Sequence, residues 1–201
     1  MNKLIIVGAG GHGKVVANNA LKNGYTDICF VDDKILGECM GFPIIGKCKD
    51  LIKFNDGKTD FIIGIGNNEI RKIIAETYNV NWVTICHPSA VVAEKVLIGK
   101  GTVVMAGVVI NCDSTIGEHS IINTGTIVEH DIRIGDYVHL SPGVSLGGTV
   151  QVGNNSHIGI GATVINNIEI CAGCVIGAGA LVVRSINEEG TYVGVPVRKI
   201  K

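Results

Sequence analysis

The sequence has no excess of charge of either sign, few aromatic residues and no long apolar run. Its 201 residues include 17 Lys and Arg against 18 Asp and Glu, and aromatic residues make up 4%. A nucleic-acid-binding protein needs a basic surface to displace counterions, so nucleic acid is not expected as a partner. A membrane-spanning helix needs roughly 18 unbroken apolar residues, and Gly, Asn, Asp or Lys interrupts every run here. We therefore expect no insertion into a membrane.

The N-terminus and the cysteines favour a cytoplasmic location. Residues 1–8 lead straight into an expected β-strand, with no apolar leader or small-residue cleavage site. The 7 cysteines are odd in number and mostly stand in apolar contexts, which is typical of a reducing compartment. Cys171 and Cys174 form a C-x-x-C pair. Without a second pair or clustered histidines, we expect ordinary packing there and no metal.

The second half of the chain repeats with a period of six residues. An aliphatic residue stands at every sixth position, and none of these positions is polar. They are Val92, Ile98, Val104, Ile110, Ile116, Ile122, Val128, Ile134, Leu140, Leu146, Val152, Ile158, Val164, Ile170, Ile176 and Val182. This period fits neither a helix nor a flat strand and predicts a parallel β-helix of triangular cross-section, with three hexads to a coil. The alternative, an ordinary parallel α/β sheet, does not explain so long a run in register.

A triangular β-helix makes two further predictions for this sequence. Each aliphatic residue should point inward and stack on its equivalent in the next coil, about 4.8 Å away. Gly99, Gly117, Gly135 and Gly153 recur at the spacing of one coil. We expect them at corners, where a positive φ costs little only for glycine.

The residues before the repeat predict a small α/β domain. Residues 3–7 are a short β-branched run, Gly8–Gly13 match G-x-G-x-x-G, and residues 14–23 favour a helix. Further strands are expected at residues 28–31 and 61–65. A glycine loop between a strand and a helix lets backbone N–H groups approach a phosphate.

The expected ligand of this domain is a single nucleotide. Asp32 and Asp33 follow the second strand, where a carboxylate can accept hydrogen bonds from a ribose or a sugar, and Gly66 and Asn67 follow the third strand at the same sheet edge. The domain is too short for the usual dinucleotide fold, so we favour a mononucleotide such as a nucleotide sugar. The alternative is that these residues form only tight strand-to-helix turns. No flexible linker precedes the repeat, so a cleft between the domains is a natural site.

His130 is the candidate general base. Asp131 adjoins it and can orient its ring, although many such surface pairs have no function. Gly148 stands one coil later, which leaves room for a ligand above His130. His139 lies half a coil away, on another face, with His157 stacked on it. His130 and His139 can therefore serve one site only across an interface between prisms, as threefold packing allows.

Several segments resemble the bacterial sugar acyltransferases that include bacillosamine N-acetyltransferases and sialic acid O-acetyltransferases. The resemblance extends over the whole chain. The segments that carry it are Gly8–Gly13, Phe30–Asp33, Gly64–Lys72, Ile122–Thr124, Glu129–Asp131 and Gly190–Pro196. Together with the repeat, it implies an α/β, Rossmann-like half-domain at 1–80 that binds a nucleotide sugar, a left-handed parallel β-helix of hexapeptide repeats at 81–185, and a C-terminal tail near the coenzyme at 186–201.

The resemblance also implies roles for individual residues. His130 is expected to be the general base and Asp131 to raise its basicity. Asp131 stands where the bacillosamine enzymes often have Glu, so its shorter arm changes the reach to His130. The UDP-sugar is expected to contact Gly10, Gly11, His12, Asp32, Asp33, Gly66, Asn67 and Asn123. Acetyl-CoA, the cosubstrate, is expected between subunits, along His139, Gly148, Ile160 and Ala178.

Three functions are consistent with these features. The favoured one is an acetyl-CoA-dependent N-acetyltransferase acting on the 4-amino group of a UDP-4-amino-4,6-dideoxy sugar, as a homotrimer with active sites at subunit interfaces. The others are an O-acetyltransferase of sialic acid or another surface-polysaccharide precursor, and a non-catalytic scaffold that binds a nucleotide sugar. In the favoured mechanism His130 takes the proton as the amine attacks the thioester, and a backbone N–H such as that of Gly148 stabilises the oxyanion. Cys112, expected beneath His130, is the cysteine to test as an acyl carrier.

Overall fold

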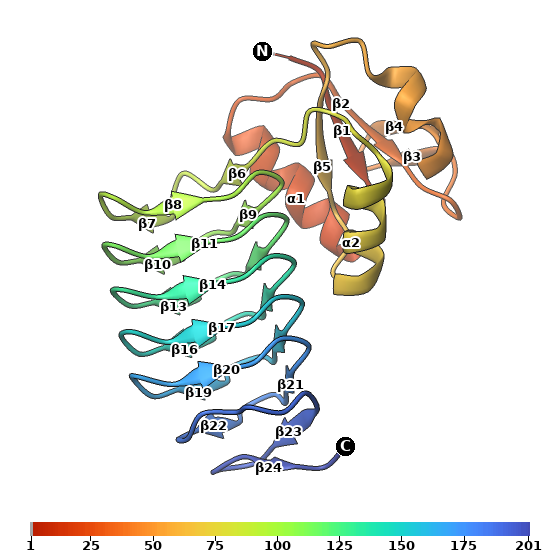
Figure 1. The fold of residues 1–201 in the computed structure, drawn as a ribbon. Helices are drawn as coiled ribbons and strands as arrows, with labels where there is room; N and C mark the ends of the chain where they lie inside the picture. The colour runs from red at the N-terminus through yellow and green to blue at the C-terminus, as the bar shows by residue number, and fades with distance from the viewer. Residues whose placement is uncertain (1) are drawn as a thin grey trace.

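The computed structural model describes residues 2–201, which form an α/β sheet followed by a triangular prism of short strands. Figure 1 shows the two parts side by side, with the prism running from β6 beside the α/β sheet to β24 at the C-terminal end. Within residues 2–201, no helix is long and apolar enough to cross a bilayer.

The N-terminal part is a five-stranded sheet in the order β3-β4-β2-β1-β5. Its strands are β1 (Leu4–Val7), β2 (Ile28–Val31), β3 (Glu38–Cys39), β4 (Phe42–Gly46) and β5 (Asp60–Ile63). Its helices are α1 (Gly11–Lys22), the 3-10 helix η1 (Cys48–Phe54) and α2 (Asn68–Thr77). The parallel strands β1, β2 and β5 are buried along their whole length, as strands covered on both faces are. The expected strands and first helix are present, and the third expected strand ends two residues earlier than predicted.

The prism consists of short strands that pass in turn through three sheets, which we call face 1, face 2 and face 3. Face 1 contains β6 (Ile85–Cys86), β9 (Val103–Val104), β12 (Ile121–Ile122), β15 (His139–Leu140), β18 (His157–Ile158), β21 (Val175–Ile176), β23 (Thr191–Val193) and β24 (Arg198–Lys199). Face 2 contains β7 (Val91–Val92), β10 (Val109–Ile110), β13 (Ile127–Val128), β16 (Ser145–Leu146), β19 (Thr163–Val164) and β22 (Leu181–Val182). Face 3 contains β8 (Leu97–Ile98), β11 (Thr115–Ile116), β14 (Arg133–Ile134), β17 (Gln151–Val152) and β20 (Glu169–Ile170).

Each coil lies in parallel register on the next, 18 residues along the chain. On face 2, for example, Ile110 pairs with Val128, and Val128 pairs with Leu146. The inward aliphatic residues form one continuous core, as the six-residue period predicts. Val92 is an exception because it lies in the first coil, where no earlier strand covers it, and it is 39% exposed.

The prediction that Gly99, Gly117, Gly135 and Gly153 adopt a positive φ at corners is wrong. None of the four has a positive φ. They are glycine because successive coils approach closely at these positions: a Cβ on Gly117 would lie 2.6 Å from the amide nitrogen of Asp136 in the next coil. The requirement is for space and not for an unusual backbone conformation.

The left-handed backbone conformation occurs elsewhere in the repeat, every six residues from Lys95 to Gly179. Several of these corner residues are not glycine. They include Asp131 with a φ of 59° and Asn155 and Asn167 with φ values of 62° and 60°. Asp and Asn tolerate this conformation better than most residues because their short polar side chains can bond locally. The side chain of Asp131 is therefore presented by a corner.

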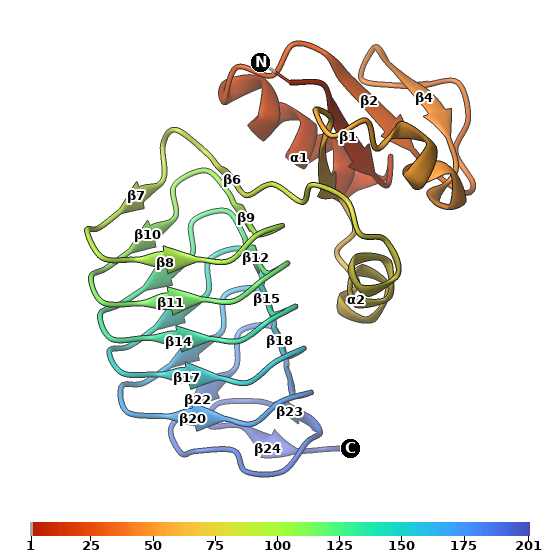
Figure 2. The ribbon, with the colours of Figure 1, turned by 45° about the horizontal axis from the view of Figure 1, so that its top comes forward.

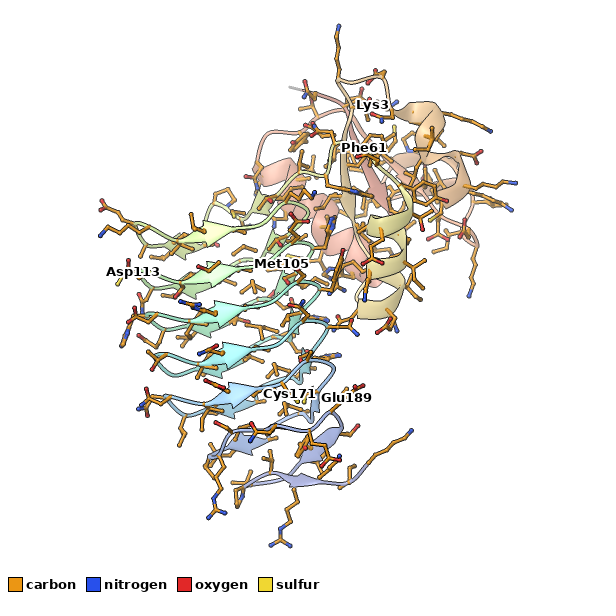
Figure 3. The ribbon with its side chains drawn as sticks, in the orientation of Figure 1. Lys3, Phe61, Met105, Asp113, Cys171 and Glu189 are labelled. Atoms are coloured by element: carbon orange, nitrogen blue, oxygen red, sulfur yellow. The ribbon has the colours of Figure 1, made fainter. Side chains whose placement is uncertain are left out.

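Face 1 packs against the α/β domain, with α1 and α2 alongside its strands (Figure 2). The Asn19 side chain in α1 donates to the carbonyl oxygen of Val104 at 3.0 Å. The neighbouring Met105 is buried in the same apolar cluster as residues of α1 and β1, and lies on the side of the prism that faces the helices (Figure 3). As expected from the absence of a linker, the two parts are in direct contact.

Candidate active site

His130 and Asp131 lie at the edge between faces 2 and 3, directly after β13. The Nδ1 atom of His130 is 2.7 Å from Oδ2 of Asp131, and the two side chains are 56% and 54% exposed. A carboxylate oxygen only accepts, so Nδ1 carries the proton in this contact and Nε2 keeps its lone pair. The pair can therefore take a proton from a neighbouring group at Nε2.

The ring of His130 lies over Gly148 of the next coil. A Cβ on Gly148 would lie 2.7 Å from Cε1 and 2.8 Å from Nε2 of His130. The space above His130 that the sequence offers to a ligand is therefore filled by the imidazole ring itself, which corrects that expectation. Within residues 2–201, the N–H group of Gly148 donates no hydrogen bond. A basic ring nitrogen and a free backbone donor are thus neighbours on an exposed edge.

The previous coil supports the turn that carries His130. The carbonyl oxygen of Cys112 accepts from the N–H of Asp131 at 3.1 Å, so Cys112 lies beneath the pair as predicted, and its thiol is free and exposed. Asp113, one coil before Asp131, marks the same edge in Figure 3, far from the α/β sheet. Within one chain, this edge therefore cannot reach the glycine loop.

His139 lies on face 1, against the α/β domain. Its Nδ1 donates to the carbonyl oxygen of Gly66 at 3.2 Å, which leaves Nε2 to accept from the Asn123 amide at 3.2 Å. His157 stacks on it with ring centroids 4.8 Å apart, as predicted. Burial, followed by the neighbouring His157 and the charge of Arg71, lowers the pKa of His139 to about 3. His139 is consequently a neutral ring with a fixed tautomer.

A cavity of about 490 Å³ opens between the start of α2 and face 1. Gly66, Asn67, His139 and His157 line it, and Glu189 bounds it toward the C-terminal end of the prism (Figure 3). The cavity brings two residues predicted for sugar binding next to His139, which was predicted for acetyl-CoA. Asn123 joins this group through its bond to His139.

The glycine loop presents two open positions. A Cβ on Gly10 or Gly11 would meet no atom within 4 Å, whereas a Cβ on Gly13 would collide with the carbonyl oxygen of Gly8. Only part of the glycine pattern therefore faces open space. His12, in the first turn of α1, is half-buried, and burial together with the charge of Arg71 lowers its pKa to about 4. Its Nε2 finds no hydrogen-bond partner within the described chain.

The two aspartates after β2 are engaged in local bonds. One oxygen of Asp32 accepts from the N–H of Ala9 at 2.8 Å, and the other accepts from two N–H groups of the following turn. Burial opposes ionisation of Asp32, but these N–H groups outweigh it and lower its pKa. Asp33 accepts from the N–H of Cys48 at 3.0 Å. Asp32 thus holds the glycine loop in addition to any contact it makes with a ligand.

Arg71 is the central residue that sequence reasoning missed. Its side chain is almost completely buried at 1% exposure. Its guanidinium donates to the carbonyl oxygens of Ile65, Gly66, His119, Tyr137 and Val138 and to the side-chain oxygen of Asn68. Burial lowers the pKa of Arg71 to about 10. Its only signal in the sequence was its place within the Gly64–Lys72 segment.

The remaining predicted residues lie on a third part of the surface. Ile160 and Ala178 stand one above the other at the edge between faces 1 and 2, and Ile160 is 61% exposed. One chain therefore places its predicted residues in separate groups: His130, Asp131 and Gly148 at one edge, Ile160 and Ala178 at another, and the remaining ones beside or within the α/β domain.

The C-x-x-C pair follows β20, at the edge between faces 3 and 1. Cys171 and Cys174 are free thiols with sulfur atoms 3.4 Å apart, and burial raises the pKa of Cys174 to about 12. Such a thiol is protonated at neutral pH. In the part of the chain that the structure describes, no three His, Cys, Asp or Glu side chains converge on a point where a metal ion could be held.

Comparison of the sequence with known families and proteins matches both parts of the fold. Residues 3–78 match the PglD N-terminal domain, and residues 113–148 match the bacterial transferase hexapeptide with six repeats. A stretch of 113 residues, 53% of this chain, is 42% identical to the UDP-N-acetylbacillosamine N-acetyltransferase of Bacillus subtilis (strain 168). The matched stretch spans 52% of that relative, about half of its length.

Solved structures match the whole chain. The acetyltransferase domain of PglB from Neisseria gonorrhoeae FA1090 is 37% identical, with a TM-score of 0.96 over 100% of both chains, and has also been solved in complex with acetyl coenzyme A. PerB from Caulobacter crescentus, in complex with CoA and GDP-perosamine, is 36% identical, with a TM-score of 0.95 over 100% of this chain and 98% of that one. The chain therefore belongs to the bacterial sugar acyltransferase family with hexapeptide repeats, which includes the bacillosamine and perosamine N-acetyltransferases.

Proposed function

We propose that this protein transfers the acetyl group of acetyl-CoA to the 4-amino group of a UDP-4-amino-4,6-dideoxy sugar, with His130 as the general base. The observation that carries the proposal is the His130–Asp131 pair, exposed on the prism edge beside the free N–H of Gly148. The relatives support an amine acceptor, because their names describe N-acetyltransferases of bacillosamine and perosamine.

In this mechanism the two groups on the prism edge divide the chemistry. Nε2 of His130 takes a proton from the amine as its nitrogen forms a bond to the thioester carbonyl carbon. The negative charge that develops on the carbonyl oxygen is stabilised by a preorganised N–H donor, for which Gly148 is the candidate. When the carbon–sulfur bond breaks, the imidazolium returns the proton to the departing thiolate of CoA, and Asp131 stabilises the imidazolium in the interval.

The separation of the predicted residues supports a site shared between copies of the chain. Gly148 and Ile160 stand on different edges of one prism, so a ligand that contacts both must lie between two prisms. We infer a homotrimer of left-handed prisms in which the His130 edge of one copy faces the Ile160 and Ala178 edge of the next. Acetyl-CoA then fits along this seam, with its apolar arm beside the exposed Ile160 side chain.

The nucleotide sugar is assigned to the α/β part, residues 1–80 in our division of the chain, with 81–185 as the acyl-transfer prism and 186–201 as its tail. Gly10 and Gly11 offer open backbone at the start of α1, and Gly66 and Asn67 open onto the 490 Å³ cavity. Helix N-termini favour phosphate oxygens because their N–H groups are unpaired and the helix dipole is positive there. Asn123, through His139, extends this surface onto face 1.

The test is release of CoA thiol by the purified protein with a set of acceptors. Turnover with UDP-4-amino-4,6-dideoxy-N-acetylglucosamine, lost in His130→Ala, is expected. Turnover only with GDP-perosamine would support N-acetylation of an amino sugar but would change the nucleotide of the acceptor from UDP to GDP. Turnover only with sialic acid or CMP-sialic acid would make the protein an O-acetyltransferase, and no turnover with any acceptor would contradict the proposal. Full activity in Cys112→Ala is expected if the transfer is direct.

A further inference from the structure

The turn that carries His130 is held from the previous coil by a buried hydroxyl group, in addition to the carbonyl oxygen of Cys112. Ser114, fully buried in the previous coil, donates from Oγ to the carbonyl oxygen of Glu129 at 2.9 Å. Oγ of Ser114 in turn accepts from the N–H of Ile132 at 3.2 Å. One hydroxyl therefore bridges the two ends of the four-residue turn in which His130 and Asp131 stand.

The same bridge occurs elsewhere in the prism, but only at the edge between faces 3 and 1. Thr102, Ser120 and Ser156 each donate to a carbonyl oxygen 15 residues later, and each accepts from an N–H group 18 residues later. The bridge is therefore a regular way of fixing a turn of the next coil, and its geometry accepts both Ser and Thr.

At the edge that carries His130, Ser114 is the exception. The equivalent corner positions of the other coils at this edge are aliphatic: they are Val96, Ile132, Val150 and Ile168. A buried aliphatic side chain stabilises a core more than a buried hydroxyl, which must be hydrogen-bonded to be tolerated at all. Among these equivalent positions, a hydroxyl is therefore found only at Ser114, beneath the turn with the His130–Asp131 pair.

Other contacts also hold this turn, each at one point. Among the backbone bonds are those of the Asp131 N–H to Cys112 and of the Glu129 N–H to Leu146. The Asn111 amide donates to the Glu129 carboxylate at 2.9 Å, and the N–H of Thr149 donates to the carbonyl oxygen of His130 at 3.0 Å. The first of these acts on a side chain and the second on the middle of the turn. Only the Ser114 hydroxyl joins the start of the turn to its end.

We propose that Ser114 is a positioning residue for acyl transfer: its hydroxyl fixes the Glu129–Ile132 turn and thereby the direction of the His130 ring over Gly148. This rests on the proposed role of His130 as the base. Ser114 is buried and touches neither substrate in this proposal, so its loss should act on the chemical step and not on binding.

The test compares Ser114→Ala with Ser156→Ala, which removes the same bridge from a turn at another edge. In Ser114→Ala we expect kcat to fall about tenfold with the KM of both substrates within about twofold of wild type, because small misplacements of a base slow the chemistry. Ser156→Ala should lower Tm to a similar extent and keep kcat. Ser114→Thr should restore kcat, because Thr102 makes the same bridge. Equal kcat values in the two alanine variants would overturn the proposal.

A second measurement does not depend on turnover. Amide hydrogen exchange at Ile132 should become faster in Ser114→Ala and stay unchanged in Ser156→Ala. If the wild type releases no thiol with any acceptor, the proposed function fails, and unchanged exchange at Ile132 would then show separately that Ser114 does not hold the turn. If wild type is active and His130→Ala is not, the kcat comparison decides the role of Ser114.

Discussion

The imidazole ring of His130 lies where a Cβ on Gly148 of the next coil would be: that Cβ would lie 2.7 Å from Cε1 of His130, so no side chain at position 148 can coexist with the present ring position. Gly148 has no positive φ, and its backbone would accept alanine without strain. The requirement for glycine here therefore comes from His130 itself. The position of the ring can therefore be tested by adding one methyl group at position 148.

Gly148→Ala should lower kcat about a hundredfold, because the new Cβ displaces the base by a distance comparable with 1 Å. Steady-state kinetics measure this, with Gly57→Ala as the control. A Cβ on Gly57 would meet no atom within 4 Å, and the residue, which lies before β5, has a φ of 77°. The control should lose about 1 kcal/mol of stability to backbone strain but keep its kcat. Wild-type activity in Gly148→Ala would show that the ring does not work from this position.

Asp131→Asn should lower kcat by about a hundredfold or more. The new amide can donate to Nδ1 of His130, which moves the ring proton to Nε2 and removes the lone pair that acts as the base. Backbone strain is not introduced, since Asn155 and Asn167 occupy the same left-handed corner position.

The matched control for this change is Asp113→Asn, one coil earlier at the same edge, with a φ of 58° and no histidine before it. It should leave kcat unchanged. If Asp131→Asn and Asp113→Asn behave alike in steady-state assays, the carboxylate of Asp131 has no special relation to the base.

Arg71→Met should lower the free energy of unfolding by about 3 kcal/mol, because it leaves several buried carbonyl oxygens without a donor. Urea unfolding measures this. Arg133→Met, an exposed change on face 3, should alter the same quantity by less than about 0.5 kcal/mol. Equal effects of the two variants would mean that the bonds of Arg71 to the prism do not stabilise the chain.

Acid should destabilise the protein below about pH 6.5. Burial lowers the pKa of His119 to about 4, as it does for His12, and that of His139 to about 3. An unfolded histidine titrates near pH 6.5, so below that pH the unfolded chain binds more protons than the folded one. Each histidine therefore removes at most about 1.4 kcal/mol per pH unit between about pH 6.5 and its folded pKa.

The measurement for this prediction is Tm between pH 7.5 and 4.5. His119→Phe should flatten the dependence, because it removes one titrating group and keeps the stacking on Tyr137. It also removes a buried Nδ1 that has no hydrogen-bond partner within the described chain. An equally steep loss of Tm in this variant would assign the acid sensitivity to other groups.

The repeat and its core could be predicted from the sequence because each coil repeats the same local pattern, as Val128 and Leu146 show. The contacts of Arg71 could not, since its guanidinium meets His119 and Tyr137, which lie 48 and 66 residues away. The error over the recurrent glycines has a related cause. A recurrent glycine in a sequence can mark either a left-handed turn or a close approach of two backbones. Gly117 lies at a close approach of two backbones.

Individual parts of the candidate site could be predicted from the sequence, but the contacts between the prism and the α/β domain could not. The sequence placed His130 beside Asp131 and beneath Gly148, because neighbours in the chain and residues one coil apart are fixed by the repeat. It did not predict that His139 bonds to Gly66, because that contact depends on how the α/β domain packs on face 1. Residue types and their spacing determine which side chains share an edge of the prism. They do not determine how the α/β domain packs on the prism.

The common register of the coils also limits how the length of this protein can change. One extra residue within a coil would turn every later inward aliphatic out of the core, from Leu140 onward if it were inserted after Ile134. A whole coil of 18 residues would instead extend the stack by one strand spacing, about 4.8 Å. The distance from His130 to the C-terminal end can therefore change only in such steps. The length of edge available to a ligand that lies along the prism is likewise a whole number of coils.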